Sequence, residues 1–218
     1  MNFKKNKYTV IKNAISKDLA IFLANYFTMK KQVFDAFIEE RFVSPFENMH
    51  GTYEDKQIPN TYSCYSDIAM ETLMLKCQPQ MEKATGLKLY PAYSYARIYK
   101  KGDILKRHKD RFSCEISTTL NLGGDPWPIF IDPTGSDNVI DEYKNIHKPN
   151  PPKGNKVLLE VGDMLVYRGH DLEHWREKFK GKECVQVFLH YNNIKTPGAK
   201  NNMFDKRRHL GLPSFFKK

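Results

Sequence analysis

The chain has 218 residues, of which 40% are hydrophobic and 13% aromatic, with a formal net charge of +10 and a pI near 9.3. These values are typical of one globular domain and exclude a disordered chain, and no apolar run reaches the roughly 20 residues of a membrane span. Because the basic residues are spread along the sequence, we expect a solvated surface rather than a nucleic-acid site.

The N-terminal residues include lysines but no apolar segment behind them, which is not the pattern of a secretory signal. The four cysteines are widely spaced and form no CxxC pair. This spacing favours reduced thiols over disulfides or a zinc site. Together these features predict a cytoplasmic protein without membrane association.

Two helices are predicted in the N-terminal part. Ser16 can cap a helix from Lys17 to Glu40, in which apolar residues recur at helical spacing. A second helix is predicted from Asp67 to Thr85, with Gly86 as its stop. The segment 43–60 between them contains prolines and a glycine, and we expect it to be irregular.

From residue 88 the pattern changes to short strands bounded by turn residues. The predicted strands are Lys88–Tyr90, Tyr93–Tyr99, Ile116–Leu122, Ile129–Asp132, Lys156–Val161, Met164–Tyr167 and Cys184–Tyr191. Two helices followed by many short strands indicate an α+β domain whose β part is a sandwich or jelly roll. We predict one domain, with a helical support region at about 1–87, a β region at about 88–195 and a C-terminal tail at 196–218.

One connection inside the β region is unusually long. The stretch from Asp132 to Asn155 is rich in turn residues and is expected to be a loop. Loops of this length in compact domains often act as lids or binding loops.

Three residues have side chains that can bind a metal ion. His108 and Asp110 directly follow a strand-like run, and strand alternation lets both side chains point to the same side. His174 follows a later strand-like run. If these three side chains converge, two imidazoles and one carboxylate can hold iron(II) on one face and leave the other positions open. The same donors also accept zinc, so the ligands alone do not select iron.

The remaining histidines have simpler interpretations. His170 is expected in a loop near the site, although it is an alternative to His174 as the metal ligand. His147 and His190 are expected to be structural or to lie on the surface.

A wider ordered pattern surrounds the three residues. It reads Arg97-x-Tyr99-x-x-Gly102-x-x-Leu105-x-x-His108-x-Asp110, followed by Gly162-Asp163-Met164, His174 and Gly181-Lys182. Over about residues 93–192 the chain thereby resembles the iron(II)/2-oxoglutarate-dependent dioxygenases, in their prolyl 4-hydroxylase-like branch. The resemblance implies a double-stranded β-helix, or jelly roll, with the N-terminal helices packed on its major sheet. It also implies that His108, Asp110 and His174 bind iron(II).

The resemblance further implies 2-oxoglutarate as cosubstrate, with ascorbate as another candidate cofactor. Lys182 matches the basic residue that binds the distal carboxylate of 2-oxoglutarate in this family. Strand alternation places Gln186 on the same face of the pocket as Lys182. Tyr99, or Tyr95 if the register differs, matches a tyrosine that assists on the strand before the first histidine.

The spacing of the basic residue departs from the family pattern. Lys182 lies closer to His174 than the family usually places it. Arg97 and Arg176 are therefore alternative anchors for 2-oxoglutarate.

The implied reaction is hydroxylation of an organic substrate with release of succinate and carbon dioxide. The family branch points to prolyl residues in a peptide or protein, and residues 132–155 could clamp an extended chain. Two alternatives stay open: a 2-oxoglutarate oxygenase that acts on nucleic acid or a small molecule, and a non-catalytic β-barrel binding module. The sequence predicts nothing about the oligomeric state.

Overall fold

The computed structural model of this protein describes residues 3–44, 46–142 and 144–218. Its two long helices are α2, Lys17–Glu39, and α3, Ile68–Thr85, and a short helix α1, Phe3–Asn6, precedes them. The Ser16 hydroxyl accepts the Leu19 N–H at 3.2 Å, and the Asp67 carboxylate accepts the Met70 N–H at 3.1 Å. These side chains cap amide groups that have no partner inside the helix. Both predicted helices are confirmed.

The strands form two larger antiparallel sheets and a hairpin. The major sheet has the order β1-β10-β5-β12-β3-β2, and the minor sheet has the order β4-β11-β6-β9. The hairpin pairs β7 with β8. The strand bounds are β1 Tyr8–Ile11, β2 Ser63–Tyr65, β3 Leu89–Lys100, β4 Leu105–His108, β5 Ile116–Gly124, β6 Ile129–Ile131, β7 Val139–Asp141, β8 Ile146–His147, β9 Asn155–Val157, β10 Met164–Tyr167, β11 His174–Arg176 and β12 Glu183–Asn193.

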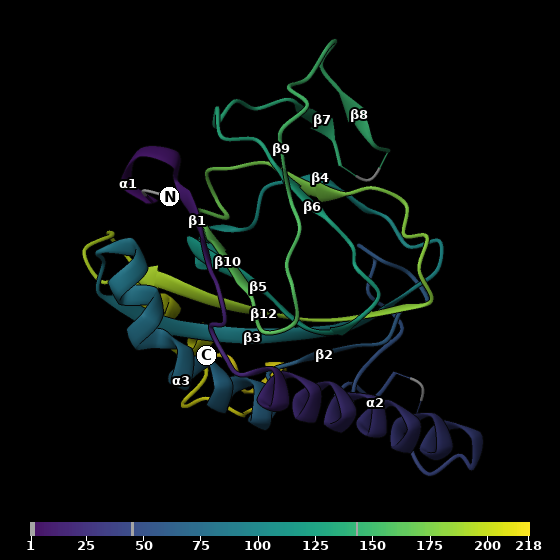
Figure 1. Ribbon diagram of the computed structural model, residues 1–218. Coiled ribbons are helices and arrows are strands. Elements are labelled where there is room, and N and C mark those ends of the chain that lie inside the picture. The colour runs from purple at the N-terminus through teal and green to yellow at the C-terminus, as the bar shows by residue number, and fades with distance from the viewer. Residues whose placement is uncertain (1–2, 45, 143) are drawn as a thin grey trace.

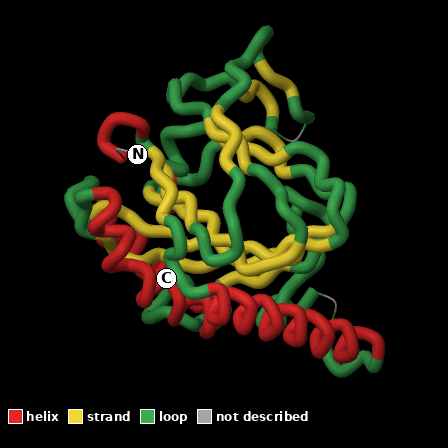
Figure 2. The backbone as a smooth tube through the Cα atoms, viewed as in Figure 1, coloured by secondary structure: helices red, strands yellow, loops and turns green. Residues whose placement is uncertain are grey.

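The long helices α2 and α3 lie on one side of the major sheet and the minor sheet lies on the other (Figures 1 and 2). Apolar side chains from α2 and α3, among them Phe27, Phe34 and Met74, are fully buried in the main core. Burying each side chain of this size stabilises the fold by about 1.5–3 kcal/mol. The protein therefore has an α+β fold with helices on the major sheet, which fits the expected double-stranded β-helix.

Strand alternation gives the two faces of the major sheet different characters. Ala96 and Ile98 of β3 belong to the core under the helices. The residues that alternate with them along the strand point to the opposite side, into the space between the two sheets. This inner face of β3 carries Tyr93, Tyr95, Arg97 and Tyr99, all of which line one cavity.

The N-terminal region is more than a helical support. Its strands β1 and β2 form the two edges of the major sheet. These two strands were not predicted from the sequence. They are held by pairing with β10 and β3, which lie far away in the chain.

Residues 132–155 are not a structureless loop. They contain the β7–β8 hairpin, which projects at the top of Figure 1. The carboxylate of Glu173 holds its base by accepting the Val139 N–H at 2.9 Å and the Asn138 side-chain amide at 2.9 Å. The predicted strand Lys156–Val161 is also shorter than expected, because β9 ends at Val157.

The C-terminal residues pack against the domain rather than forming a solvated tail. Short 3₁₀ helices at Ala199–Lys206 and Ser214–Phe216 lie in this segment, and a third lies at Phe112–Cys114. The Arg207 guanidinium is buried and pairs with the Glu71 carboxylate at 2.7 Å. Since an unpaired charge at this depth would be costly, the pair fixes the segment to α3.

Two further expectations concern the cysteines and membrane spans. All four cysteines are buried and unpaired, as the spacing predicted. Among the described residues, no helix combines the length and the apolar character that a membrane crossing needs.

Candidate metal centre

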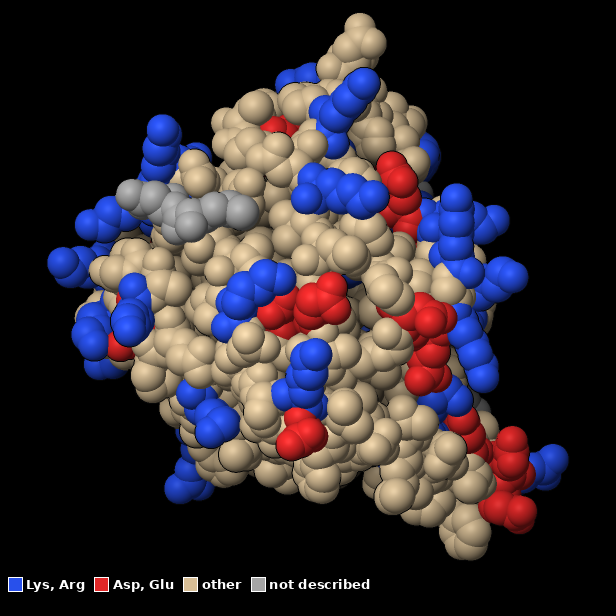
Figure 3. Space-filling model, in the orientation of Figure 1, with Lys and Arg blue, Asp and Glu red and all other residues tan. Residues whose placement is uncertain are grey.

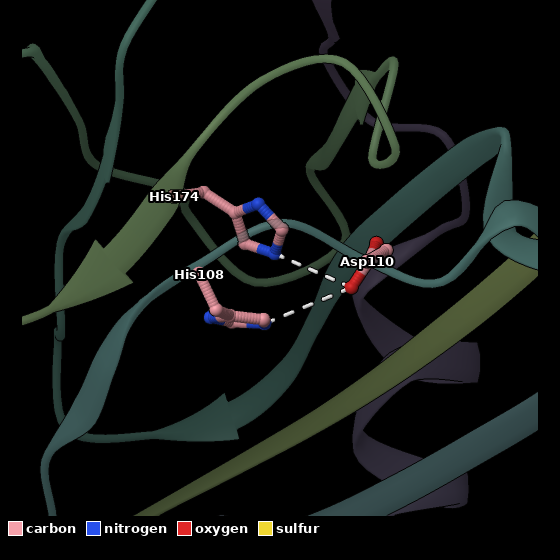
Figure 4. A group of neighbouring side chains, drawn as sticks. All are labelled: His108, Asp110 and His174. Carbon is pink, nitrogen blue, oxygen red and sulfur yellow. Dashed lines mark ion pairs between the residues drawn. The ribbon is translucent and has the colours of Figure 1, made fainter. Parts of the chain in front are cut away.

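The three predicted ligands converge at one end of the minor sheet (Figure 4). His108 ends β4, His174 begins β11, and the two are paired across the neighbouring strands. The Asp110 Oδ1 atom lies 3.7 Å from His108 Nε2 and 3.5 Å from His174 Nε2. One ligand atom from each residue lies within 4.8 Å of the others, so a single ion can contact all three.

Backbone carbonyls set the tautomers of both imidazoles. His108 Nδ1 lies 2.8 Å from the Lys106 carbonyl, and His174 Nδ1 lies 3.0 Å from the Leu172 carbonyl. A carbonyl only accepts, so each Nδ1 carries a hydrogen. Both Nε2 atoms therefore face the Asp110 carboxylate, where a protonated ring can donate to it and a neutral ring can bind a metal.

The carboxylate of Asp110 is held in its ionised form. Burial alone would raise its pKa, but the neighbouring His174 and His108 side chains hold the pKa well below its usual range. The Ser117 hydroxyl donates to the other oxygen, Oδ2, at 2.6 Å. Oδ1 thus stays available to an ion.

The donor set fits a divalent transition metal. Two imidazoles and one carboxylate on one side form the facial arrangement of non-haem iron(II) sites. The open side of this arrangement faces a cavity of about 310 Å³. A cosubstrate and oxygen would need that open side.

Residues of the irregular segment 43–60 close the cavity over the three ligands. The Gln57 side-chain amide lies 3.0 Å from His108 Nε2, and its carbonyl oxygen accepts from Arg97 at 3.3 Å. Arg97 also forms an ion pair with Asp55, whose carboxylate accepts the Tyr95 hydroxyl at 2.5 Å. No motif in the sequence indicated Gln57 or Asp55, because both lie far from the ligands along the chain.

Of the predicted cosubstrate residues, Tyr95, Arg97 and Tyr99 line this cavity from β3. Gln186 and Arg176 are buried and are not among the residues that line it, and neither is Lys182. Lys182 is exposed to solvent. Strand alternation does not apply to it because β12 begins only at Glu183. The chain turns at Gly181, and the Lys182 N–H donates to the Asp125 carboxylate at 2.5 Å.

Arg176 lies two residues after His174 on the same strand, and alternation places both side chains on one face of it. Its guanidinium is fully buried and donates to the Trp127 carbonyl, to the Thr119 hydroxyl at 3.2 Å and to the Gln186 carbonyl at 3.4 Å. Within the described chain no carboxylate pairs with it, and its Nε atom has no hydrogen-bond partner. Burial lowers the pKa of Arg176 below its ordinary value. A buried cation without a counter-ion is a ready site for an anion.

The other histidines differ in their relation to the centre. His170 is exposed, and its Nδ1 lies 3.3 Å from the Asp110 carbonyl, so it lies beside the site and outside the group of three. His147 is on the β7–β8 hairpin. His190, expected to be structural or on the surface, is buried and lines the cavity. Its position on β12 opposite Ser117 of β5 brings it there.

Gly169 is a further residue that the sequence did not single out. Its carbonyl accepts the Asp110 N–H at 2.9 Å. A Cβ atom at this position would lie 2.2 Å from Asp110 Oδ2 and 2.4 Å from Ser117 Oγ. The absence of a side chain here therefore leaves room for the carboxylate and its hydroxyl partner.

Neither a protein-family model nor a curated protein sequence matches this chain. Solved structures are similar at low sequence identity. A prolyl-4-hydroxylase from Pseudomonas putida is 14% identical with a TM-score of 0.58, over 88% of this chain and 95% of that one. HygX from Streptomyces hygroscopicus, with nickel, 2-oxoglutarate and hygromycin B bound, is 14% identical with a TM-score of 0.57, over 88% and 85%.

A third similar structure is the α-ketoglutarate-dependent epimerase SnoN from nogalamycin biosynthesis. It is 10% identical with a TM-score of 0.60, over 88% of this chain and 80% of that one. This protein therefore has the fold of the iron/2-oxoglutarate-dependent oxygenases, as the resemblance predicted.

Proposed function

We propose that this protein is an iron(II)- and 2-oxoglutarate-dependent dioxygenase that hydroxylates an organic substrate. In this reaction the substrate C–H, oxygen and 2-oxoglutarate give the substrate C–OH, succinate and carbon dioxide. The observation that supports it best is the meeting of His108, Asp110 and His174 at the wall of a cavity. An intact set of ligands with an open side argues against a binding module that only retains a jelly-roll fold.

His108, Asp110 and His174 would hold the metal through Nε2, Oδ1 and Nε2. When bound, iron(II) supplies oxygen activation coupled to decarboxylation of the cosubstrate. The chain itself fixes the geometry: carbonyls of Lys106 and Leu172 orient the rings, and burial of the ligands excludes bulk water. The role of the protein is therefore to pre-arrange one open face.

Arg176, rather than Lys182, is the residue that we propose to bind the distal carboxylate of 2-oxoglutarate. Arg176 lies on the strand that begins with His174, and within the described chain no carboxylate pairs with its charge. Arg97 is the weaker candidate because Asp55 already neutralises it. The hydroxyl of Tyr99, a cavity residue that affects the pKa of Arg176, would assist. A guanidinium also matches a carboxylate geometrically, through two parallel hydrogen bonds.

Prolyl residues in a peptide or protein are the proposed substrate. The similar prolyl-4-hydroxylase supports this choice, as do the aromatic side chains of Tyr93, Tyr95 and Phe188 in the cavity wall, on which a pyrrolidine ring can pack. The β7–β8 hairpin, anchored through Glu173 directly beside His174, would guide the peptide.

A small molecule is the second candidate substrate. Gln57 reaches over the ligands and, together with Asp55, narrows the cavity, which suits a compact substrate. HygX, a structure with the same fold, holds hygromycin B. Nucleic acid is disfavoured on the face shown in Figure 3, where acidic side chains lie among the lysines and arginines.

The decisive experiment is an anaerobic titration with iron(II) and 2-oxoglutarate, followed by the weak visible charge-transfer band of the complex. We expect the band in the wild type and its loss in Asp110→Ala. No band in the wild type, or a band that persists in the variant, would contradict the proposed centre.

The substrate class is tested by succinate release. A proline-containing peptide, the same peptide with alanine in place of proline, and hygromycin B would be compared, with and without ascorbate. Stimulation by the proline peptide alone supports the prolyl proposal, whereas stimulation by hygromycin B alone favours the small-molecule alternative.

A further inference from the structure

A chain of three polar groups connects the metal-ligating carboxylate to the far wall of the cavity. Ser117 Oγ lies 2.6 Å from Asp110 Oδ2, 3.0 Å from the Cys114 carbonyl and 3.0 Å from His190 Nδ1. Ser117 is fully buried, and His190 is 6% exposed. Gly169 packs against the junction, so the groups have little freedom to move.

The number of available hydrogens decides which of these three groups donates and which accepts. A serine hydroxyl has one hydrogen, and the ionised Asp110 oxygen is both the nearest acceptor and the strongest. The hydroxyl hydrogen therefore goes to Asp110. Ser117 Oγ can then only accept from His190, which requires the hydrogen of the imidazole to lie on Nδ1. The other nitrogen of His190, Nε2, is left as an acceptor.

The surroundings of His190 agree with this assignment. Burial lowers the pKa of His190 to about 4, so the ring is neutral near pH 7. The Tyr93 ring lies against it at a centroid distance of 4.6 Å, and the Tyr93 hydroxyl is hydrogen-bonded to the Cys114 thiol at 3.1 Å. Both His190 and Tyr93 line the cavity.

We propose that Ser117 and His190 are positioning residues: Ser117 fixes the metal-ligating carboxylate, and the same hydroxyl holds His190 as an Nδ1–H tautomer whose Nε2 accepts a hydrogen bond on the cavity side. The proposal rests on the metal-dependent function proposed above. Such an acceptor favours a substrate that carries an N–H or O–H group near the reacting carbon. A prolyl residue has no N–H of its own, so a peptide would supply the N–H of the following residue.

Nitrogen-15 NMR of the histidine rings tests the tautomer directly. The sample is the protein loaded with zinc(II) and 2-oxoglutarate at about pH 7, and His190→Asn identifies the His190 signals. We expect a neutral His190 with its hydrogen on Nδ1 in the wild type, and hydrogen shifted toward Nε2 in Ser117→Ala. A charged ring, or a wild-type ring with its hydrogen on Nε2, overturns the proposal.

Metal affinity tests the positioning of Asp110. Because partners of metal ligands contribute about 10- to 100-fold in affinity, Ser117→Ala should weaken zinc(II) binding by that factor. The zinc(II) affinity of Ser117→Cys, which keeps the volume and a weak donor, should fall between those of the wild type and Ser117→Ala. Ser117→Cys replaces Ser117→Ala in this test if the alanine variant does not fold.

The matched control is Thr118→Val on the same strand. This buried hydroxyl accepts the Leu189 N–H at 3.1 Å and faces away from the ligands. We expect its zinc(II) affinity to stay within about 2-fold of the wild type. Equal losses in Thr118→Val and Ser117→Ala would reduce Ser117 to a structural role. The iron(II)/2-oxoglutarate band distinguishes a failure of this inference from a failure of the proposed function. A wild type that forms the band but carries the His190 hydrogen on Nε2 refutes only this inference.

Discussion

Gly169→Ala is the substitution that most directly tests how the carboxylate is held. The new Cβ would lie 2.2 Å from Asp110 Oδ2, 2.4 Å from Ser117 Oγ and 2.8 Å from the Cys114 carbonyl. Non-bonded carbon and oxygen atoms need more than 3 Å, so the carboxylate has to move by roughly 1 Å. Overpacking of this kind costs about 1–3 kcal/mol of stability.

Gly169→Ala should weaken metal binding more than it lowers the free energy of unfolding. Displacing a ligand together with its hydrogen-bond partner removes the interactions that orient it, and we expect at least about 100-fold weaker zinc(II) binding, or roughly 2.7 kcal/mol. Competition titration with a chelating dye measures the affinity, and urea unfolding followed by circular dichroism measures the stability.

Gly123→Ala provides the control for Gly169→Ala. Gly123 is a buried glycine of β5, and a Cβ there would meet only the Ala24 Cβ at an ordinary 3.5 Å. It should change the free energy of unfolding by less than about 1 kcal/mol and leave the metal affinity unchanged. If Gly169→Ala bound zinc(II) as tightly as Gly123→Ala, the proposed packing around Asp110 would be wrong.

Three further predictions concern charges in and around the barrel. Replacing Arg176 with Met removes a buried charge that no carboxylate of the described chain pairs with, so the thermal shift on adding 2-oxoglutarate should disappear. A retained shift would refute the anchor. Lys182→Ala should leave 2-oxoglutarate affinity within about 2-fold by calorimetry, because Lys182 is exposed; a large loss would restore Lys182 as the anchor. Burial lowers the pKa of His190 to about 4. The neutral ring therefore contributes stability that is complete above pH 6.5 and is lost as the pH falls toward 4. Between pH 7 and 5 the wild type should therefore lose about 2 kcal/mol more than His190→Asn in urea unfolding, and equal losses would contradict the buried neutral ring.

The local parts of the fold could be predicted from the sequence. Ser16, Asp67 and Gly86 mark the ends of the two helices because caps and left-handed stops act within one turn. His108 and Asp110 were predicted as a pair for the same reason, since two residues after a strand are oriented by a few bonds.

The pairing of distant segments could not be predicted in detail. Strands β1, β2 and β11 were not predicted, and each has its backbone groups satisfied by a partner strand far away in the chain. Lys182 was the expected anchor because it matches the basic residue of the family, and alternation placed it on the face of Gln186, although β12 begins only at Glu183. A turn at Gly181 ends that alternation, and the turn depends on contact with Asp125 on another loop.

The sequence by itself determined the chemistry that is available: two histidines and an aspartate with the donors of a metal site, set in an α+β chain. Only the tertiary structure decided which charges meet that site. Packing of the two sheets buries Arg176 with no counter-ion in the described part of the chain, brings Ser117 and His190 to Asp110, and places Gln57 over the ligands. These contacts arise from strand register and close packing between residues far apart in the chain, which local sequence does not encode.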